Sequence, residues 1–446
     1  LVRGLRLLNQ ADACVQVMVQ ETGEHVIVTA GEVHLERCIE DLQHRYAKVA
    51  VNASEPIVPF RETIVPPPTV DMVNEAIQAQ QTVTKKETDD EAVGVDGVVT
   101  MYTANKQSVV KLRAVPLPQD VTTFLENHQE LIRTMDRHLH AHGSELSESM
   151  EKLSVREAAV AMGEKTRKAV EVFRTSLGDL LEKDGWSRSS VEEVWCFGPR
   201  RCGPNLLVNR IPGHSGRNLW DPLSKQGCQP ALLEYDSSFV NGFQMATLAG
   251  PLCEEPMMGV AFVVEDWTID QTLDVTASSF GPLSGQIMSA VKEGCRKAFQ
   301  AQPQRLMAAM YSCHIQANAE ILGKMYGVLN RRHGRVLHGD MTQGSSSFSV
   351  QAVLPVVESF LFAPEMRKQT SGLASPQLVF SHWEVIDVDP FWSPRTEEEY
   401  LHYGEKADSE NRARKYMDQV RRRKGLLVQQ KIVQFAEKQR TLGKNK

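Results

Sequence analysis

The sequence predicts a multidomain α+β protein with two ferredoxin-like split βαβ domains and a basic helical C-terminal tail. Two patterns carry most of this prediction. In residues 303–388, alternating strands and amphipathic helices follow the order β-α-β-β-α-β, which is the order of a split βαβ unit. In residues 1–63 the order is α-β-β-α-β, which is the same unit without its first strand. The residues between these two regions are predicted to form a separate α/β domain.

The first domain, residues 1–63, begins inside a helix and continues into a hairpin. Valines alternate on both arms of this hairpin, at positions 15, 17 and 19 and again at 26 and 28. The helix after Gly31 is amphipathic, and Lys48–Val51 is the last predicted strand. The missing first strand would be central in such a sheet, so we expect this chain to be the C-terminal part of a longer protein.

Residues 64–107 have the composition of a disordered insertion. They begin near a run of three prolines, carry a charged segment at 85–91 and contain few large apolar side chains. We therefore predict no secondary structure for this insertion.

Residues 108–302 are predicted to form the central α/β domain, which contains a charged helical insertion at 120–183. One strand, Lys111–Pro118, precedes this insertion. The elements predicted after it are a strand at 194–199, a helix at 238–247, a buried strand at 259–264 and a helix at 284–299.

A helix of the domain at 303–388 ends in a group of cationic and titratable side chains around Gly334. These are Arg331, Arg332, His333 and Arg335. Such a helix end can bind phosphate or a polar loop. The same side chains can instead be solvated and only complement the helix dipole. The spacing leaves both alternatives open, and we keep all four residues as candidate RNA contacts.

The tail, residues 389–446, concentrates positive charge in a chain whose formal net charge is −6. Residues 401–446 hold thirteen Lys and Arg against five Asp and Glu, hence a net +8. The densest cluster is Arg421, Arg422, Arg423 and Lys424. We predict a helical arm that contacts RNA phosphate, anchored by Leu426, Leu427, Ile432 and Phe435. The alternative is a solvated charged terminus.

The chain lacks the signals of several other protein classes. Its eight cysteines form no C-x-x-C pair, which argues against structural zinc and a secreted disulfide framework. No apolar run has the roughly 18–20 residues of a membrane helix, so we expect no membrane partner. His34 lies between Glu32 and Glu36, but i and i+2 side chains do not share a helix face, and we predict no metal site.

The motifs of enzymes are also missing. There is no G-x-x-x-x-G-K-[ST] loop to hold nucleotide phosphates. Asn105-Lys-Gln-Ser108 begins like a guanine-reading motif, but Ser stands where an Asp would contact the base. Gly213-His-Ser-Gly-Arg217 has Arg at the last position of a nucleophile elbow. We predict no catalytic and no nucleotide-binding residue in this chain.

Three groups of motifs, in order along the chain, resemble the elongation factor 2/G family of translational GTPases. The first resembles the third domain of that family: Glu24-His25, Gly31-Glu-Val-His-Leu-Glu36 and Ser54-Glu-Pro-Ile-Val-Pro-Phe-Arg-Glu62. The second resembles the fourth domain: Trp195-Cys-Phe-Gly-Pro199, Gly242-Phe-Gln-Met-Ala-Thr247, Leu252-Cys-Glu-Glu-Pro-Met257 and Gly285-Gln-Ile287. The third resembles the last domain: Tyr326-Gly-Val-Leu-Asn-Arg-Arg-His-Gly-Arg-Val336, Leu354-Pro-Val-Val-Glu-Ser-Phe360 and His382-Trp383.

This resemblance implies family domains III (1–63), IV (108–302) and V (303–388), with domain IV of the ribosomal protein S5-like type. It implies that this chain binds no cofactor itself. GTP and Mg²⁺ are expected in a G domain outside these residues, which is where the parent protein would hydrolyse GTP.

One departure from the family distinguishes its branches. Elongation factor 2 carries a modified histidine at the tip of domain IV, where this sequence has Gly281, and no His occurs between Asp266 and Ile287. Ser279, Phe280 and Gly281 are the candidate tip residues. The departure favours the branch that matures the large ribosomal subunit in the cytoplasm. That branch implies three partners: the subunit's rRNA and proteins, an SBDS-family protein, and eukaryotic initiation factor 6, which is released. The alternatives are an elongation factor 2-like translocase, a spliceosomal relative, or a non-enzymatic rRNA- or protein-binding module.

Overall fold

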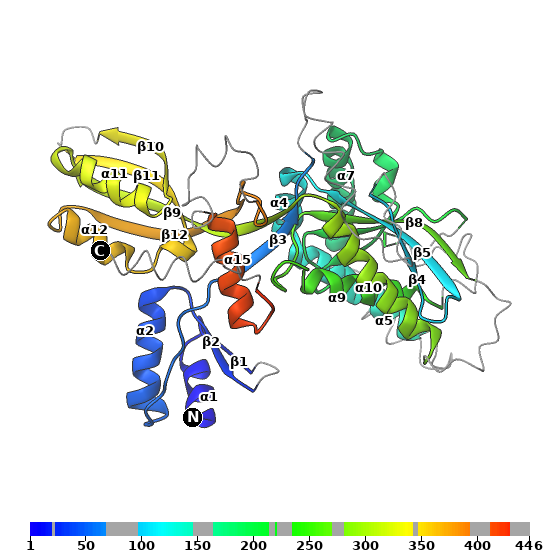
Figure 1. Cartoon of the computed structure of the whole chain (residues 1–446), viewed down its shortest axis with the longest axis horizontal. Helices are drawn as coiled ribbons and strands as arrows, with labels where there is room; N and C mark the ends of the chain where they lie inside the picture. The colour runs from blue at the N-terminus through cyan, green and yellow to red at the C-terminus, as the bar shows by residue number, and fades with distance from the viewer. Residues whose placement is uncertain are drawn as a thin grey trace, which may run out of the picture. The chain divides into compact units, whose positions relative to one another are not determined.

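The structure is a computed structural model that describes residues 1–19, 23–67, 97–145, 164–213, 219–220, 234–269, 281–341, 347–392 and 411–428 (Figure 1). The chain divides into two compact units. Unit 1 consists of residues 1–59 and 309–383, and unit 2 consists of residues 60–308 and 384–446. No helix in the described part of the chain is both long enough and apolar enough to span a membrane.

The N-terminal part of unit 1 is a small α/β layer. Its elements are α1 (Val2–Ala11), β1 (Gln16–Val19), β2 (His25–Val28), α2 (Glu32–Asp41) and a π-helical turn (Leu42–Tyr46). Strands β1 and β2 form an antiparallel two-stranded sheet. The helices pack on this sheet through the apolar side chains that the helical spacing predicts. The buried helical residues are Leu5, Leu8, Cys38 and Leu42, and Val15, just before β1, is buried with them.

The strand predicted at Lys48–Val51 is not formed. In its place, the Val51 carbonyl accepts a hydrogen bond from the Gln43 side chain at 2.9 Å. The only sheet described in this part of the unit consists of β1 and β2, which pair with each other. A segment without a neighbouring strand cannot form a ladder, so its alternating pattern alone does not make it a strand.

The C-terminal part of unit 1 has the predicted order of elements. After the long strand β9 (Gln304–Asn318) come α11 (Leu322–Arg331), β10 (Arg335–Met341), β11 (Ser347–Pro355), α12 (Phe362–Gln369) and β12 (Ser375–Val385). The strands lie in the order β10-β11-β9-β12. Alternate residues of β9 and β11 face the helices, and Cys313, Ile315, Val350 and Leu354 are buried there.

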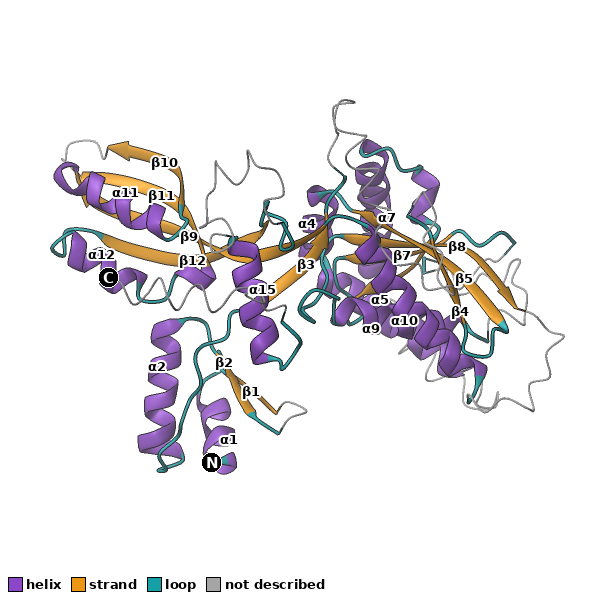
Figure 2. Ribbon diagram, viewed as in Figure 1, coloured by secondary structure: helices purple, strands orange, loops and turns teal. Residues whose placement is uncertain are grey.

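Unit 2 contains a five-stranded sheet with helices on both faces (Figure 2). Its strands, in sheet order, are β4 (Val99–Tyr102), β5 (Ser108–Pro116), β8 (Val260–Ile269), β7 (Asn205–Asn209) and β6 (Val194–Gly198). The pair β7–β8 is parallel and the other pairs are antiparallel. Strands β5, β6 and β8 were predicted, whereas β4 and β7 were not.

The alternation of β8 explains the two covered faces. Phe262 and Val264 pack under α9 (Asp236–Leu248) and α10 (Leu283–Ala301), whereas Ala261 and Val263 face the opposite core. That second core is built by α4 (Gln119–Asn127), α5 (Gln129–Glu145) and α7 (Glu164–Lys183), with Leu125, Phe173 and Leu177 fully buried. The helical insertion is therefore part of the fold of unit 2.

The structure differs from the predicted domain boundaries between residues 60 and 107. Strand β3 (Phe60–Ile64) belongs to unit 2, where it pairs antiparallel with the start of β9, from Phe60↔Ala308 to Ile64↔Gln304. Strand β4 lies inside the segment that was predicted to be disordered. It is ordered because its valine and methionine pack at the edge of the unit 2 core. The prediction for residues 68–96 falls outside the described residues.

Candidate functional site

The four candidate residues at the end of α11 do not share one role. The Arg332 guanidinium donates to the Glu365 carboxylate at 2.9 and 2.5 Å. It also donates to the carbonyl oxygens of Glu358, at 2.9 Å, and Phe360, at 2.5 Å. Arg332 therefore ties the end of α11 to the segment that begins α12. Its donors are occupied by protein, which corrects its prediction as an RNA contact.

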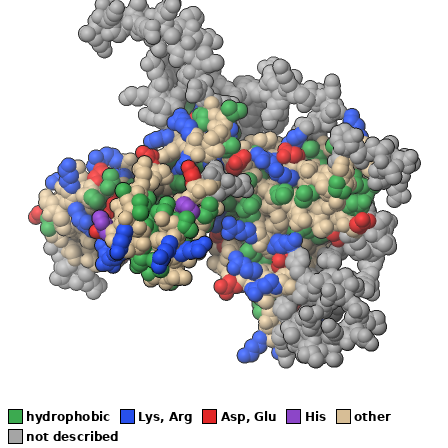
Figure 3. Space-filling model, turned by 90° about the horizontal axis from the view of Figure 1, so that it is seen from below, with side chains coloured by type: hydrophobic (Ala, Val, Ile, Leu, Met, Phe, Trp, Pro, Cys, Tyr) green, Lys and Arg blue, Asp and Glu red, His purple; other side chains and the backbone are tan. Residues whose placement is uncertain are grey.

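The other three side chains are exposed. Arg331 is 61% exposed and lies 3.4 Å from a second oxygen of Glu365. His333 takes the left-handed backbone conformation that ends the helix, with a φ of 55°, and Arg335 is the first residue of β10. These three remain candidate contacts. On the face drawn in Figure 3, Lys and Arg side chains occur in separate groups with acidic and apolar side chains between them.

The basic tail forms a helix that packs onto unit 2. Helix α15 (Arg412–Arg423) begins at Asn411, whose side-chain oxygen accepts from the Arg414 amide at 3.0 Å. Its buried residues are Ala413, Tyr416, Met417 and Val420, and the Tyr416 ring stacks on Phe60 at 5.4 Å between centroids. Of the predicted anchors, Leu427 was wrong, since it is 89% exposed, and Ile432 and Phe435 lie outside the described residues. The helix stops before it, with Gly425 in a left-handed conformation.

Two of the four cations at the end of α15 bind protein. The Arg421 guanidinium donates to the Leu252 carbonyl oxygen. The Lys424 ammonium donates to the Glu254 carbonyl oxygen at 2.7 Å and pairs with the Glu255 carboxylate at 2.8 Å. Arg422 and Arg423 are exposed. Lys424 is exposed as well, but its ammonium is bound to protein, so Arg422 and Arg423 are the exposed members of the predicted cluster for which no hydrogen bond to the 252–255 loop is found among the described residues.

The loop that receives Arg421 and Lys424 is organised by a buried carboxylate that the sequence analysis missed. Glu62 is fully buried, and its two oxygens accept the backbone N–H groups of Leu252, Cys253 and Glu255 at 2.8, 2.8 and 3.1 Å. Burial raises the pKa of Glu62, although the three N–H donors act in the opposite direction. A Cβ at Gly250 would lie 2.1 Å from a Glu62 oxygen, so this position requires glycine.

We predict that α15 detaches when its two protein-bound cations are removed. In the double variant Arg421→Ala/Lys424→Ala, the amides of α15 should exchange with solvent about tenfold faster, since the hydrogen bonds to the 252–255 loop are lost. Hydrogen exchange measured by mass spectrometry checks this. Arg422→Ala is the control and should leave exchange unchanged. Equal exchange in the double variant would contradict the docking contact.

The segment predicted to form the tip of a domain IV is described only in part. Ser279 and Phe280 lie outside the described residues. Gly281 is exposed, and its φ of 79° is a conformation that favours glycine. Gln286, at the start of α10, donates to the Gly281 carbonyl at 3.0 Å and accepts from the Asn105 amide at 3.2 Å. The Asn105–Ser108 run is thus the β4–β5 turn that supports the tip.

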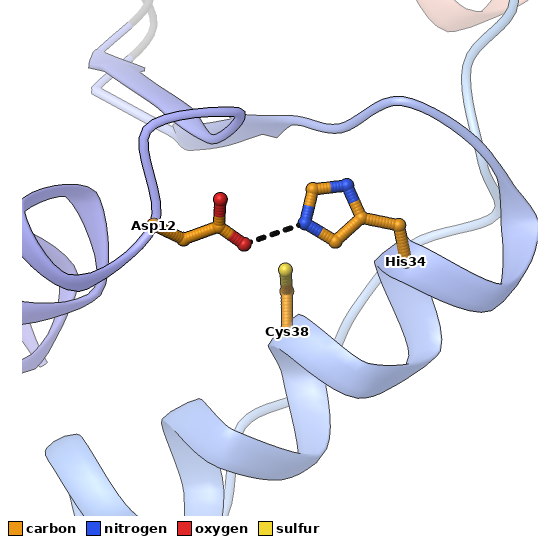
Figure 4. Close-up of side chains that lie close together, drawn as sticks. All are labelled: Asp12, His34 and Cys38. Carbon is orange, nitrogen blue, oxygen red and sulfur yellow. Dashed lines mark hydrogen bonds and ion pairs between the residues drawn. The ribbon is translucent and has the colours of Figure 1, made fainter.

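Asp12, His34 and Cys38 are the one group in the described residues that could hold a metal ion (Figure 4). The Ala30 amide donates to His34 Nδ1 at 3.1 Å, so the ring proton lies on Nε2 and is donated to Asp12 at 2.8 Å. Burial and two nearby carboxylates raise the pKa of the Cys38 thiol. Both ring nitrogens are occupied and the thiol is protonated, so the group fits a structural hydrogen-bond bridge better than a metal site.

The sequence analysis rejected a metal site formed by His34 with its neighbours Glu32 and Glu36, but it did not find the acid that His34 contacts. That acid is Asp12, from the turn before β1, rather than Glu32 or Glu36. The Cys14 amide also donates to Asp12, at 2.8 Å, and holds the pKa of that carboxyl below its usual range. Only the pairing of distant segments reveals this group.

Comparisons with known proteins show which family this chain resembles along its whole length. The model of the elongation factor-like GTPase 1-like domain matches residues 113–210, and that of the elongation factor G C-terminus matches residues 305–392. The chain is 47% identical to elongation factor-like GTPase 1 of Mus musculus and of Homo sapiens, over 100% of this chain and 44% of each relative. It is 40% identical to ribosome assembly protein 1 of Schizosaccharomyces pombe, over 99% of this chain and 42% of that protein.

The chain spans less than half the length of these relatives. The first matched region holds the helices of the insertion with β5, β6 and β7, and the second holds the β-α-β-β-α-β part of the chain. The identity extends over all of the chain, including the parts that neither model matches. The chain belongs to the elongation factor-like GTPase 1 family, and it corresponds to the C-terminal part of its relatives.

Proposed function

We propose that this chain is the ribosome-contacting part of a GTPase that matures the cytoplasmic large ribosomal subunit. In this role it acts with an SBDS-family protein to promote the release of eukaryotic initiation factor 6 from the subunit. The observation that carries the proposal is the similarity to a fission-yeast ribosome assembly protein over 99% of this chain. In sequence, the tip also has Gly281 in place of the histidine of a translocase.

The proposal assigns a role to each part of the chain. Residues 1–59 correspond to family domain III, the sheet and helices of unit 2 to an S5-like domain IV, and the part from β9 to β12 to a ferredoxin-like domain V. The exposed cations Arg331, Arg335 and Arg422 are the proposed rRNA contacts, because a chain with a net charge of −6 can meet RNA only at local basic positions.

A chimera tests this function in cells. The matching C-terminal part of ribosome assembly protein 1 in Schizosaccharomyces pombe is replaced by this chain, and the native protein is then depleted. Growth is expected, with initiation factor 6 released from cytoplasmic large subunits, as measured by sedimentation and immunoblotting. Rescue of cells depleted of elongation factor 2 would favour the translocase and overturn the proposal. Sedimentation of the purified chain with large subunits checks ribosome binding separately.

Within this chimera, Phe280→Ala should reduce release of initiation factor 6 more than it reduces ribosome binding. In sequence, Phe280 is an aromatic residue next to small residues, and an aromatic side chain can anchor a protein interface. The matched control is Phe391→Ala, which removes an exposed aromatic ring (45% exposed) elsewhere in unit 2. Equal loss of binding and release would assign Phe280 to docking alone.

We predict that the purified chain does not bind GTP. A phosphate loop supplies backbone donors and a lysine to the nucleotide, and the sequence contains no such motif. Titration of the chain with fluorescent GTP should show no saturable signal at micromolar concentrations. A titration with fluorescent ATP is the control and should give the same signal change. Saturable binding that GTP but not ATP displaces would contradict this prediction.

A further inference from the structure

The loop between β6 and β7 holds two arginines in an uncommon backbone conformation. Arg200 and Arg201 are consecutive and have φ values of 55° and 59°. Left-handed conformations are strained for residues with a Cβ, and glycine would adopt them without strain. Two adjacent positions that carry arginine at this cost indicate that the side chains serve a purpose, because strained residues gather at functional sites.

The rest of unit 2 fixes this conformation. The Gln244 side chain accepts the Arg201 amide at 2.9 Å and donates to the Phe197 carbonyl at 2.7 Å, so it spans the end of β6 and the loop. The two ends of the loop approach closely at Gly203, where an added Cβ would lie 2.4 Å from the Gly198 carbonyl oxygen. This approach is possible because glycine has no side chain. The loop is therefore preorganised by α9 and by its own backbone.

Helix α5 brings two more arginines to this loop. Arg133 and Arg137 are one turn apart on the helix and both are exposed. The Arg133 guanidinium reaches Cys202 Sγ at 3.5 Å, and Asp136, between them, lies 3.5 Å from the Arg201 guanidinium. Asp136 thus pairs with Arg201 and lies between Arg133 and Arg137 in the sequence of α5, and the exposed Glu130 precedes Arg133 by one turn. We call Arg133, Arg137, Arg200 and Arg201 the arginine surface.

We propose that the arginine surface binds the phosphodiester backbone of RNA. Planar guanidinium groups bind phosphate oxygens in a two-pronged geometry, and they are weakly hydrated compared with lysine. Arg200 is exposed at the turn of the loop, whereas Arg201 is held by Asp136 and by its amide. Arg133 and Arg200 are therefore the main phosphate contacts, and Arg201 positions the loop. This inference rests on the proposed ribosomal function in one respect only, namely the identity of the RNA that is bound.

Fluorescence anisotropy of the purified full chain with a labelled 20-base-pair RNA duplex tests the site. Between 50 and 200 mM salt, Arg133→Gln/Arg200→Gln should weaken binding about tenfold and reduce the slope of log K against log salt by about 2, because two phosphate contacts are lost. The matched control is Lys183→Gln, an exposed cation in the last turn of α7. The control should change neither affinity nor slope.

A second variant separates a binding role from a structural one. Arg200→Gly removes the strain and the side chain together. It should raise the melting temperature by about 2–4 °C while it weakens RNA binding. A structural role for Arg200 would instead lower the melting temperature. RNA affinity that is unchanged in both variants would overturn the inference, as would displacement of the RNA by polyglutamate at equal charge concentration, which would favour an acidic protein partner.

The outcomes also separate this site from the proposed function. If the wild-type chain sediments with large subunits but the double variant Arg133→Gln/Arg200→Gln binds RNA normally, only the arginine surface is wrongly assigned. If the arginine surface binds RNA but the chain neither sediments with large subunits nor supports the chimera, only the ribosomal function fails.

Discussion

Replacing Glu62 with alanine is expected to lower the free energy of unfolding of unit 2 by about 3–9 kcal/mol, because three buried N–H groups lose their acceptor at about 1–3 kcal/mol each. These are the amides of Leu252, Cys253 and Glu255. Urea unfolding followed by native-state hydrogen exchange measures the change, and exchange should speed up first in the 250–256 loop. The control, Glu293→Ala, removes an exposed carboxylate of α10 and should change stability by less than about 0.5 kcal/mol.

A second variant tests the same contact from the other side. Gly250→Ala places a Cβ within 2.1 Å of a Glu62 oxygen, so either the carboxylate or the loop has to move. If both variants retain wild-type stability, the 250–255 loop does not depend on Glu62. The docking of α15 should weaken with the loop, since Arg421 and Lys424 bind its carbonyl oxygens.

Two neighbouring arginines at the end of α11 are expected to differ sharply. Arg332→Ala should destabilise unit 1 by about 2–3 kcal/mol, because charge-assisted hydrogen bonds to Glu365 and two carbonyl oxygens are lost. Arg331→Ala removes a side chain that is 61% exposed and should change stability by less than about 0.5 kcal/mol. Urea unfolding of both variants measures the difference.

Binding should reverse that order. Arg331→Ala should weaken sedimentation with large subunits and leave the fold intact, whereas any loss of binding in Arg332→Ala should follow the loss of folded protein. Arg332→Lys keeps the charge but not the fork of donors, and it should restore only part of the stability. Equal stability of the two alanine variants would contradict the structural role of Arg332.

The elements were predictable wherever their periodicity was strong. Strand β8, helix α10 and the β9-to-β12 order follow from alternation and from helical spacing, which reflect the backbone geometry of the element itself. The pattern failed at Lys48–Val51, because a strand also needs a neighbour with which to pair. It failed at β4, because a short strand in a polar segment is stabilised by the core that it covers.

The candidate sites divide in the same way. The sequence alone located the cations of the α11 end and of the tail, since charge is a property of composition. Only the tertiary structure showed that Arg332, Arg421 and Lys424 bind protein and that Arg331 and Arg422 face solvent.

The remaining features depend on contacts between distant segments. Glu62 meets its three amides about 190 residues further along the chain, and Asp12 meets His34 from a different element. The left-handed backbone of Arg200 and Arg201 is imposed by Gln244 and by the close approach at Gly203, neither of which leaves a local sequence signal. The sequence by itself determined the charge pattern and the strongly periodic helices and strands, because both arise from local residue order. The tertiary structure decided which charges are buried, paired or presented, because burial and pairing depend on segments that meet only in the folded protein.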